Sequence, residues 1–213
     1  MNVNFEYAKT LAGEGSILLL LGLIPYVGWV LAIVGIVLLT KAMKELSYYY
    51  QDESLYKEAL TGIKFYGVAI IAAAVAIVSI VIGAASATDL FEGNFVFTAA
   101  FAVGLIAFFA GLITAFVFFL LAASHLKATF TKLAEKTGEG SFSTAGTLFF
   151  VGSILTIVMV GFLLIFLAWI FATIGFFSMK SRQYQPYPKN GNGSTAAQPA
   201  TQPTQTQLTE TQP

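Results

Sequence analysis

Residues 65–87 read FYGVAIIAAAVAIVSIVIGAASA and contain no charged side chain. A helix crosses the ~30 Å hydrocarbon core of a bilayer with roughly 20 apolar residues, at a rise of about 1.5 Å per residue. This run therefore predicts one transmembrane helix. Three further apolar runs lie at residues 16–40, 95–124 and 147–178, and together the four runs predict an all-α, polytopic transmembrane bundle.

The composition supports the same class. Of the 213 residues, 57% are hydrophobic and 10% are charged, whereas soluble domains contain about 45–50% apolar and about 25% charged residues. The absence of Cys excludes disulfides, iron–sulfur clusters and thiol catalysis, and a single His excludes a multi-histidine metal site. With 11 basic and 11 acidic residues, the chain has no net field for nucleic acid. We expect membrane lipids as partners, and neither a cofactor nor a nucleic acid.

The first and fourth runs are long enough for either one kinked helix or two short helices joined by a turn. Pro25 lies in the motif IPYVGW at residues 24–29. Proline breaks a helix interior but suits its first position, and Tyr and Trp prefer the membrane surface. The motif therefore favours a turn, although a kinked transmembrane helix is the alternative.

The basic residues distinguish these two topologies. Four lie between the first and second runs, none between the second and third, three between the third and fourth, and four at the two ends. Four spans would place seven of them on one side and four on the other, whereas six spans place all 11 on one side. The positive-inside rule favours six short spans arranged as three hairpins, with the basic loops and both termini cytoplasmic. Four spans, with long kinked first and last helices, remain the alternative.

A weak internal similarity also suggests a second hairpin. Val27-Gly28-Trp29 in the first run resembles Val160-Gly161-Phe162 in the fourth. We therefore interpret Pro25, Gly28 and Gly161 as turn or hinge positions. Inverted or repeated hairpins of this kind are common in membrane transporters.

Glu14 is the sharpest single candidate for a polar site within the membrane. If Pro25 lies at the outer surface, Glu14 lies about 16 Å deeper, where a carboxylate is costly unless it is protonated or paired. In the four-span alternative the same residue lies at the interface. His125, where the third run ends, is interpreted as an interfacial histidine, because no further metal-binding side chains are evident nearby.

Small residues recur at four-residue spacing in the third run, at Gly104, Ala107, Gly111 and Ala115. Such stripes let helices approach closely, since lipid provides no hydrophobic drive for association. They predict helix packing within the chain or between copies. In the polar stretch between the first two runs, Asp52 is predicted to cap a helix that begins near Glu53, with Glu53 and Lys57 as an i,i+4 pair.

Residues 1–182 are therefore expected to form the transmembrane helical domain. Residues 183–213, rich in Gln, Thr and Pro, are predicted to be a disordered tail because they can bury almost no apolar surface. Asn192-Gly193-Ser194 is a glycosylation sequon, and a glycan on Asn192 would require an external tail.

Several of these motifs resemble one known family. They are GSIL at residues 15–18 followed by IPYVG and KAMKELS, and, later in the chain, GSIL at 152–155, VGFL at 160–163 and AWI at 168–170. The pattern resembles the archaeal domain-of-unknown-function family 996 over about residues 8–180. The resemblance implies an archaeal plasma-membrane protein and supplies neither an activity nor catalytic residues.

The residues show no catalytic dyad, metal cluster or nucleotide-binding loop. We therefore expect a non-enzymatic structural or interaction component of the membrane, with a possible homo-oligomer or a second membrane protein as partner. The alternative is a small oligomeric transporter or channel that uses Glu14 and the hairpins around Pro25 and Gly161.

Overall fold

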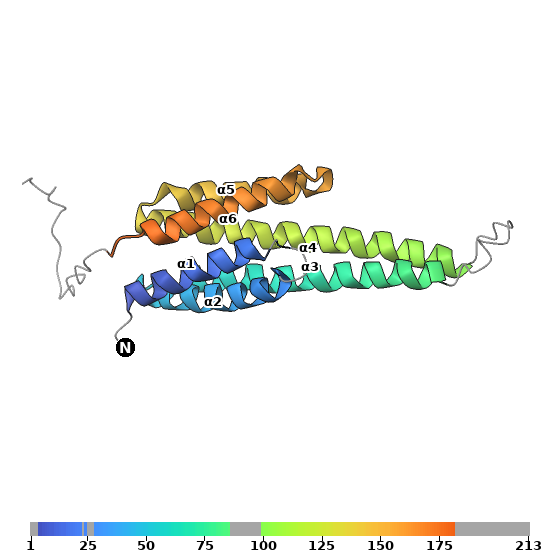
Figure 1. Cartoon of the computed structure of the whole chain (residues 1–213), viewed down its shortest axis with the longest axis horizontal. Helices are drawn as coiled ribbons and strands as arrows, with labels where there is room; N and C mark the ends of the chain where they lie inside the picture. The colour runs from blue at the N-terminus through green and yellow to red at the C-terminus, as the bar shows by residue number, and fades with distance from the viewer. Residues whose placement is uncertain (1–3, 23, 25–27, 86–98, 182–213) are drawn as a thin grey trace, which may run out of the picture. The chain divides into compact units, whose positions relative to one another are not determined.

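The computed structural model describes residues 4–22, 24, 28–85 and 99–181 (Figure 1). In these residues the chain forms six α-helices and one short 3₁₀ turn and has no strand, so the predicted all-α class is confirmed. The helices are α1 (Phe5–Leu21), α2 (Gly28–Tyr49), α3 (Glu53–Ala85), α4 (Ala99–Thr137), α5 (Gly140–Leu155) and α6 (Val160–Ser178), and the turn η2 (Thr156–Val158) joins the last two. All belong to one compact unit, Met1–Arg182. The predicted disordered tail and Asn192 lie outside the described residues.

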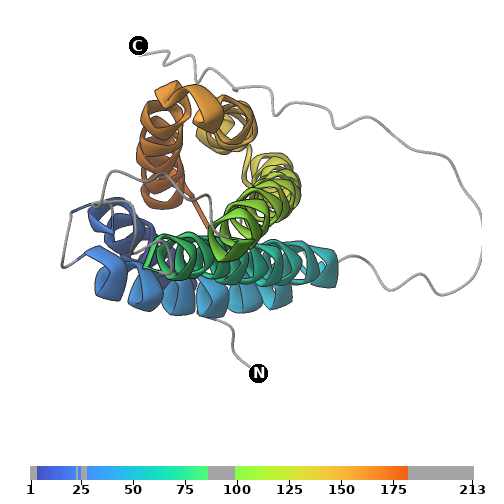
Figure 2. The same ribbon diagram turned by 90° about the vertical axis from the view of Figure 1, so that its right-hand side faces the viewer.

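The helices pack as neighbours in sequence. Each of α1 to α5 packs against the helix that follows it, and α6 packs against α1, so the six helices close a ring (Figure 2). Glycines set the closest approaches. In α1 and α2, an added Cβ at Gly35 would lie 2.8 Å from the Gly15 carbonyl oxygen. Ser16 of α1 accepts a hydrogen bond from Thr173 of α6 at 2.9 Å, which joins the first helix to the last.

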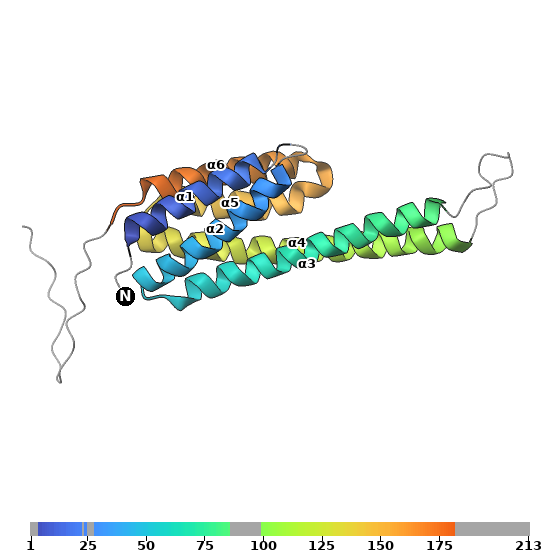
Figure 3. The same cartoon turned by 60° about the horizontal axis from the view of Figure 1, so that its bottom comes forward.

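The core lies at one end of the ring, which we call the basal end. The α2–α3 and α4–α5 connections and the end of α6 lie there. Phe142 is fully buried and contacts Phe130 and Phe176, with ring centroids 6.0 and 5.0 Å apart. Leu46, Leu55, Leu133, Met43 and Met179 complete the set of large, fully buried side chains. At the other end α3 and α4 continue past the other four helices (Figures 1 and 3).

The basal connections have specific caps. Gln51 adopts a left-handed conformation, with φ of 54°, and ends α2. Asp52 accepts a hydrogen bond from the Ser54 backbone N–H at 3.0 Å, which confirms the predicted N-cap of α3. Gly138, with φ of 77°, closes α4 through a hydrogen bond from its N–H to the Ala134 carbonyl at 2.8 Å.

Among the residues that the structure describes, four helical segments are long and apolar enough to cross a membrane: Glu53–Ala85, Phe101–Thr137, Gly140–Val158 and Val160–Ser178. Their outward faces carry exposed Ile, Val, Leu and Phe. A water-soluble monomer rarely exposes apolar surface on this scale, so the helices are consistent with a membrane protein. In the described residues the first apolar run covers the end of α1 and the first part of α2, and the fourth covers the second part of α5 and all of α6.

Candidate functional site

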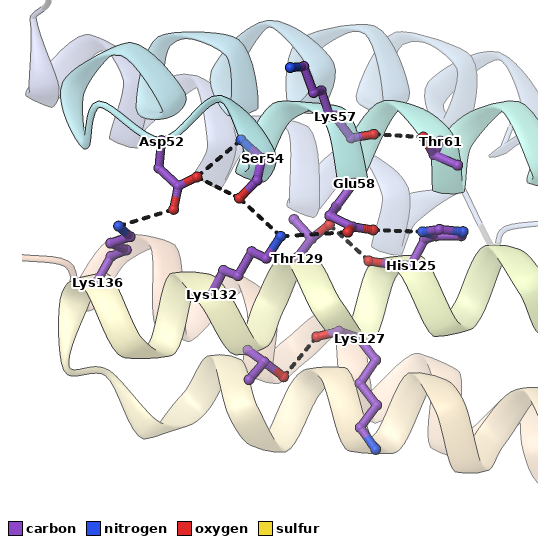
Figure 4. Close-up of polar contacts among 11 residues, drawn as sticks. Asp52, Ser54, Lys57, Glu58, Thr61, His125, Lys127, Thr129, Lys132 and Lys136 are labelled. Atoms are coloured by element: carbon purple, nitrogen blue, oxygen red, sulfur yellow. Dashed lines mark hydrogen bonds and ion pairs between the residues drawn. The ribbon is translucent and has the colours of Figure 1, made fainter.

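The largest group of polar contacts joins the start of α3 to the end of α4 (Figure 4). Ser54 and Glu58 are four residues apart on α3, and His125, Lys132 and Lys136 follow one face of α4. Helical residues at spacings of four, seven and eleven share a face, so the two sets meet when the helices pack antiparallel. We call these five residues, together with Asp52, the α3–α4 polar cluster.

Glu58 is the centre of the cluster. One carboxylate oxygen lies 2.7 Å from Nδ1 of His125, and the other lies 3.6 Å from Nζ of Lys132. Side chains of all three residues are about 30% exposed, so water screens the pairs only partly. The centroid of the Phe65 ring lies 5.4 Å from that of the His125 ring. The imidazole therefore lies next to both a carboxylate and an aromatic ring.

Asp52 forms the second half of the cluster. Its carboxylate accepts a hydrogen bond from the Ser54 hydroxyl at 2.5 Å and pairs with Lys136 at 3.0 Å. The Ser54 hydroxyl and the Lys136 ammonium lower the pKa of Asp52 to about 2, because both favour the charged carboxylate. Lys132 donates to Ser54 at 3.0 Å and so links the Asp52 and Glu58 halves.

This arrangement fastens two helices together. Each acidic group in the cluster is paired with a basic group on the other helix, and the hydroxyl of Ser54 bridges them. Over the residues that the structure describes, no three His, Cys, Asp or Glu side chains come together as a metal site. His125 and Glu58 could supply two metal ligands, whereas the smallest such metal-binding group has three.

Glu14, the predicted intramembrane site, lies on the outside of α1. Its side chain is exposed, while the flanking Gly13 and Gly15 are buried against α6 and α2. In the described part of the chain, Glu14 makes no ion pair. The two glycines allow the close approach of the neighbouring helices, and Glu14 points away from it.

Two of the three predicted hinge positions lie at close backbone contacts. Gly28 is the first residue of α2, and an added Cβ there would touch the Gly22 carbonyl oxygen. Gly161 is the second residue of α6, and an added Cβ would touch the Gly152 oxygen and the Thr156 nitrogen. Pro25 lies outside the described residues.

The small residues of α4 face α3. An added Cβ at Gly104 would lie 2.8 Å from the Ser79 carbonyl oxygen, and one at Gly111 would lie 2.9 Å from the Ala76 Cβ. Ala115, one turn beyond Gly111, is buried, and Ala107 is partly buried. This stripe packs inside the α3–α4 pair.

Glu58, Lys132 and Lys136 were not among the site residues predicted from the sequence. The spacing of His125, Lys132 and Lys136 does indicate one polar face on a helix, and Ser54 and Glu58, four residues apart, indicate another. The sequence does not show at which height these two faces meet, because that depends on the register between α3 and α4. Gly62 sets that register, since an added Cβ there would lie 3.3 Å from the Ala122 oxygen and from the His125 Cβ.

Comparison with known proteins gives two matches. Residues 31–170 match the family model described as "Protein of unknown function (DUF996)". The chain is also 30% identical over 183 residues to "Uncharacterized protein MJ1644" of Methanocaldococcus jannaschii, which covers 84% of this chain and 95% of that protein. No solved structure matches the chain.

Proposed function

The chain belongs to the DUF996 family of proteins of unknown function, and we propose that it is a non-enzymatic structural or interaction component of an archaeal plasma membrane. The archaeal setting is proposed because the relative described above comes from an archaeon. Membrane lipids are the proposed partners of the exposed apolar faces of α3 and α4. A second copy of the chain or another membrane protein is a further possible partner.

This proposal rests on how the polar side chains are used. Ser79 and Thr114, on the apolar parts of α3 and α4, donate to carbonyls one turn back in their own helices, Val75 and Ala110, both at 2.8 Å. In the part of the chain that the structure describes, no fully buried side-chain N or O atom lacks a hydrogen bond. A hydroxyl that donates to its own helix has its proton engaged there, so it is not a free donor for a substrate.

The proposed topology has three hairpins that enter the membrane from the cytoplasmic side. The basal connections at residues 50–52 and 138–139 then lie in the cytoplasm with both termini, and all 11 basic residues fall on that side. This distribution agrees with the positive-inside rule.

Cysteine accessibility tests the topology, because the chain contains no Cys. A single Cys in place of exposed Lys57 of α3, and another in place of Ser194 in the tail, should react with a membrane-impermeant maleimide in inverted vesicles. Neither should react in intact cells. Labelling of either residue from outside would contradict the proposed topology.

Reconstitution tests the proposed function against the transporter alternative. We expect wild-type proteoliposomes to show the same proton and cation flux as protein-free liposomes. Glu14→Gln, with Glu6→Gln as a matched control on the exposed face of α1, should change nothing. Flux that is present in the wild type and lost only in Glu14→Gln would overturn the proposal and establish a transporter.

A further inference from the structure

The turn between α5 and α6 consists of apolar residues that face outward. Residues 155–161 read LTIVMVG and contain no charge. Met159 is 77% exposed and Ile157 is 71% exposed, and Val158 and Val160 are more than half exposed. A turn at the water surface is ordinarily polar, because exposed apolar side chains there gain nothing from burial. This turn has the composition of a segment that lipid surrounds.

Hydrogen bonds within the hairpin close this turn. The Met159 N–H donates to the Thr156 carbonyl at 3.1 Å, and the Phe162 N–H donates to the Met159 carbonyl at 3.2 Å. The Thr156 hydroxyl donates to the Gly152 carbonyl at 2.8 Å. In lipid each unpaired backbone group costs several kcal/mol, and these bonds, together with the close packing of Gly161 on the Gly152 carbonyl, cover part of the turn's backbone within the hairpin.

The exposed charges on α3 fix one edge of the hydrocarbon. Lys64 is exposed, and the helix from there to Ala85 carries exposed Val and Ile without a charge. At a rise of about 1.5 Å per residue this segment is about 31 Å long, which equals one full hydrocarbon core. The near edge therefore lies at Lys64, and the far edge lies at the α3–α4 tip.

The contacts between helices show how deep α5 lies relative to Lys64 of α3. Gly62, close to the edge, packs on His125 of α4, and Gly146 of α5 packs on Lys127 of the same helix. Thr156 lies ten residues beyond Gly146, or about 15 Å along the helix. The α5–α6 turn thus reaches about 10 Å past the near edge and stops far short of the α3–α4 tip, as Figures 1 and 3 show.

The first hairpin is shallower still. Ser16 of α1 is level with Thr173 of α6, through their hydrogen bond. Gly22 lies about 9 Å beyond Ser16, whereas Val160 lies about 20 Å beyond Thr173. Exposed Trp29 near this turn suits an interfacial depth.

Charges on the first hairpin agree with this depth. Glu14 and Lys41 are exposed on α1 and α2. They lie about 12 and 20 Å from the turn along their helices, so a hairpin that crossed the bilayer would hold both within the hydrocarbon. A hairpin whose turn lies at the near edge keeps both charges outside the hydrocarbon, where they cost little.

We propose that α5–α6 is a re-entrant hairpin that enters from the side of the basic residues and turns inside the near leaflet. The turn of α1–α2 lies at the near edge of the hydrocarbon, and only α3–α4 crosses the bilayer. This inference rests on the proposed topology and replaces the six crossings expected from the sequence with two. It keeps all 11 basic residues on one side. The hydrocarbon of one leaflet is then the binding partner of the α5–α6 turn.

Single-cysteine labelling distinguishes a re-entrant turn from a crossing one. Met159→Cys and Ile157→Cys place the thiol on exposed side chains of the turn. Asp89→Cys, in the charged α3–α4 connection, marks the far side, and Lys180→Cys marks the near side. We expect Asp89→Cys to label in intact cells, Lys180→Cys to label in inverted vesicles, and both turn variants to label at least about ten-fold more slowly from either side. All four should label at equal rates after denaturation in SDS.

Each other outcome contradicts a specific part of the reasoning. If Met159→Cys and Ile157→Cys label from outside as fast as Asp89→Cys, the hairpin crosses and the inference is wrong. If they label as fast as Lys180→Cys in inverted vesicles, the turn lies in cytoplasmic water and the inference is again wrong. If Asp89→Cys itself fails to label from outside, the proposed topology fails, and the re-entrant α5–α6 hairpin fails with it.

A spin label at Met159→Cys separates lipid from protein as the cause of protection. Molecular oxygen concentrates in hydrocarbon, whereas a charged nickel chelate does not enter it. We expect collisions of the label with oxygen to exceed those with the chelate, and the reverse at Lys180→Cys. A label that collides with neither reagent would show that protein covers the turn, and this would overturn the proposed contact with lipid.

Discussion

Replacing Gly161 with Ala should weaken the α5–α6 hairpin. An added Cβ at this position would touch the carbonyl oxygen of Gly152 and the backbone nitrogen of Thr156. Both are backbone atoms, which cannot move away by a side-chain rotation. The methyl group can therefore be accommodated only if α5 and α6 move apart near their turn.

The magnitude follows from two opposing effects. Replacing Gly with Ala within a helix ordinarily stabilises it by about 1 kcal/mol, because glycine loses more backbone freedom on folding. Forcing an extra methyl group into a tightly packed contact costs about 1–3 kcal/mol, and more where backbone must move. We expect the cost to exceed the gain at Gly161, with a net loss of about 2 kcal/mol.

Gly67 is the matched control. It lies within α3, and an added Cβ there has no neighbouring heavy atom within 4 Å. Gly67→Ala should therefore show the favourable effect alone, a gain of up to about 1 kcal/mol. The same chemical change thus has opposite signs at the two positions.

Thermal unfolding of the purified protein in detergent, followed by Trp fluorescence, measures both variants. For a chain of this size 1 kcal/mol corresponds to about 2–4 °C in Tm. Gly161→Ala should lower Tm by about 4–8 °C, and Gly67→Ala should raise it by about 2–4 °C. A Gly161→Ala protein that is as stable as the wild type would refute the close packing of Gly152 on Gly161.

Three further predictions concern the polar cluster and the core. Asp52 has a folded pKa of about 2, below its ordinary 3.8. The charged carboxylate therefore stabilises the fold above pH ~4, and this stabilisation, at most about 1 kcal/mol after solvent screening, is lost as the pH falls toward 2. In Asp52→Asn the free energy of unfolding should depend less on pH across this range, and an unchanged pH dependence would contradict the Lys136 pairing. Glu58→Gln and His125→Ala should be non-additive by about 1 kcal/mol in a double-mutant cycle, whereas additive effects would show that the two side chains act independently. Phe142→Ala, at a fully buried position, should cost about 3–5 kcal/mol in unfolding free energy, and a loss below about 1 kcal/mol would contradict its place in the core.

Fold class follows from sequence because the solvent leaves few choices. A backbone surrounded by lipid must satisfy its hydrogen bonds within each segment, so a chain with four long apolar runs has to be helical. The ends of helices were partly predictable, since Asp52 and Gly138 are the residue types that begin and end helices. The end of α4 was harder to place. It continues to Thr137, well past the apolar run, because Leu126, Phe130 and Leu133 extend the buried stripe into the basal core.

The candidate site was only partly predictable. The Glu53–Lys57 pair lies within one helix, and the structure confirms it at 3.0 Å. Glu58 of α3 lies 67 residues before His125 of α4, and their meeting depends on the register between these two helices, at which Gly62 makes a close contact. Periodicity gives the face of one helix, and it does not give the height at which two helices meet.

The closed ring has a consequence for the order in which the chain folds. The hydrogen bond between Ser16 and Thr173 joins residues 157 positions apart. A translating ribosome completes α1 long before it makes α6, so the buried face of α1 must wait for its last neighbour. Closing so long a loop costs conformational entropy, and the contacts that offset this cost form only when α6 docks against α1. We therefore expect ring closure to be the slowest step of folding, and α1–α2 to be the part that chaperones and proteases meet first.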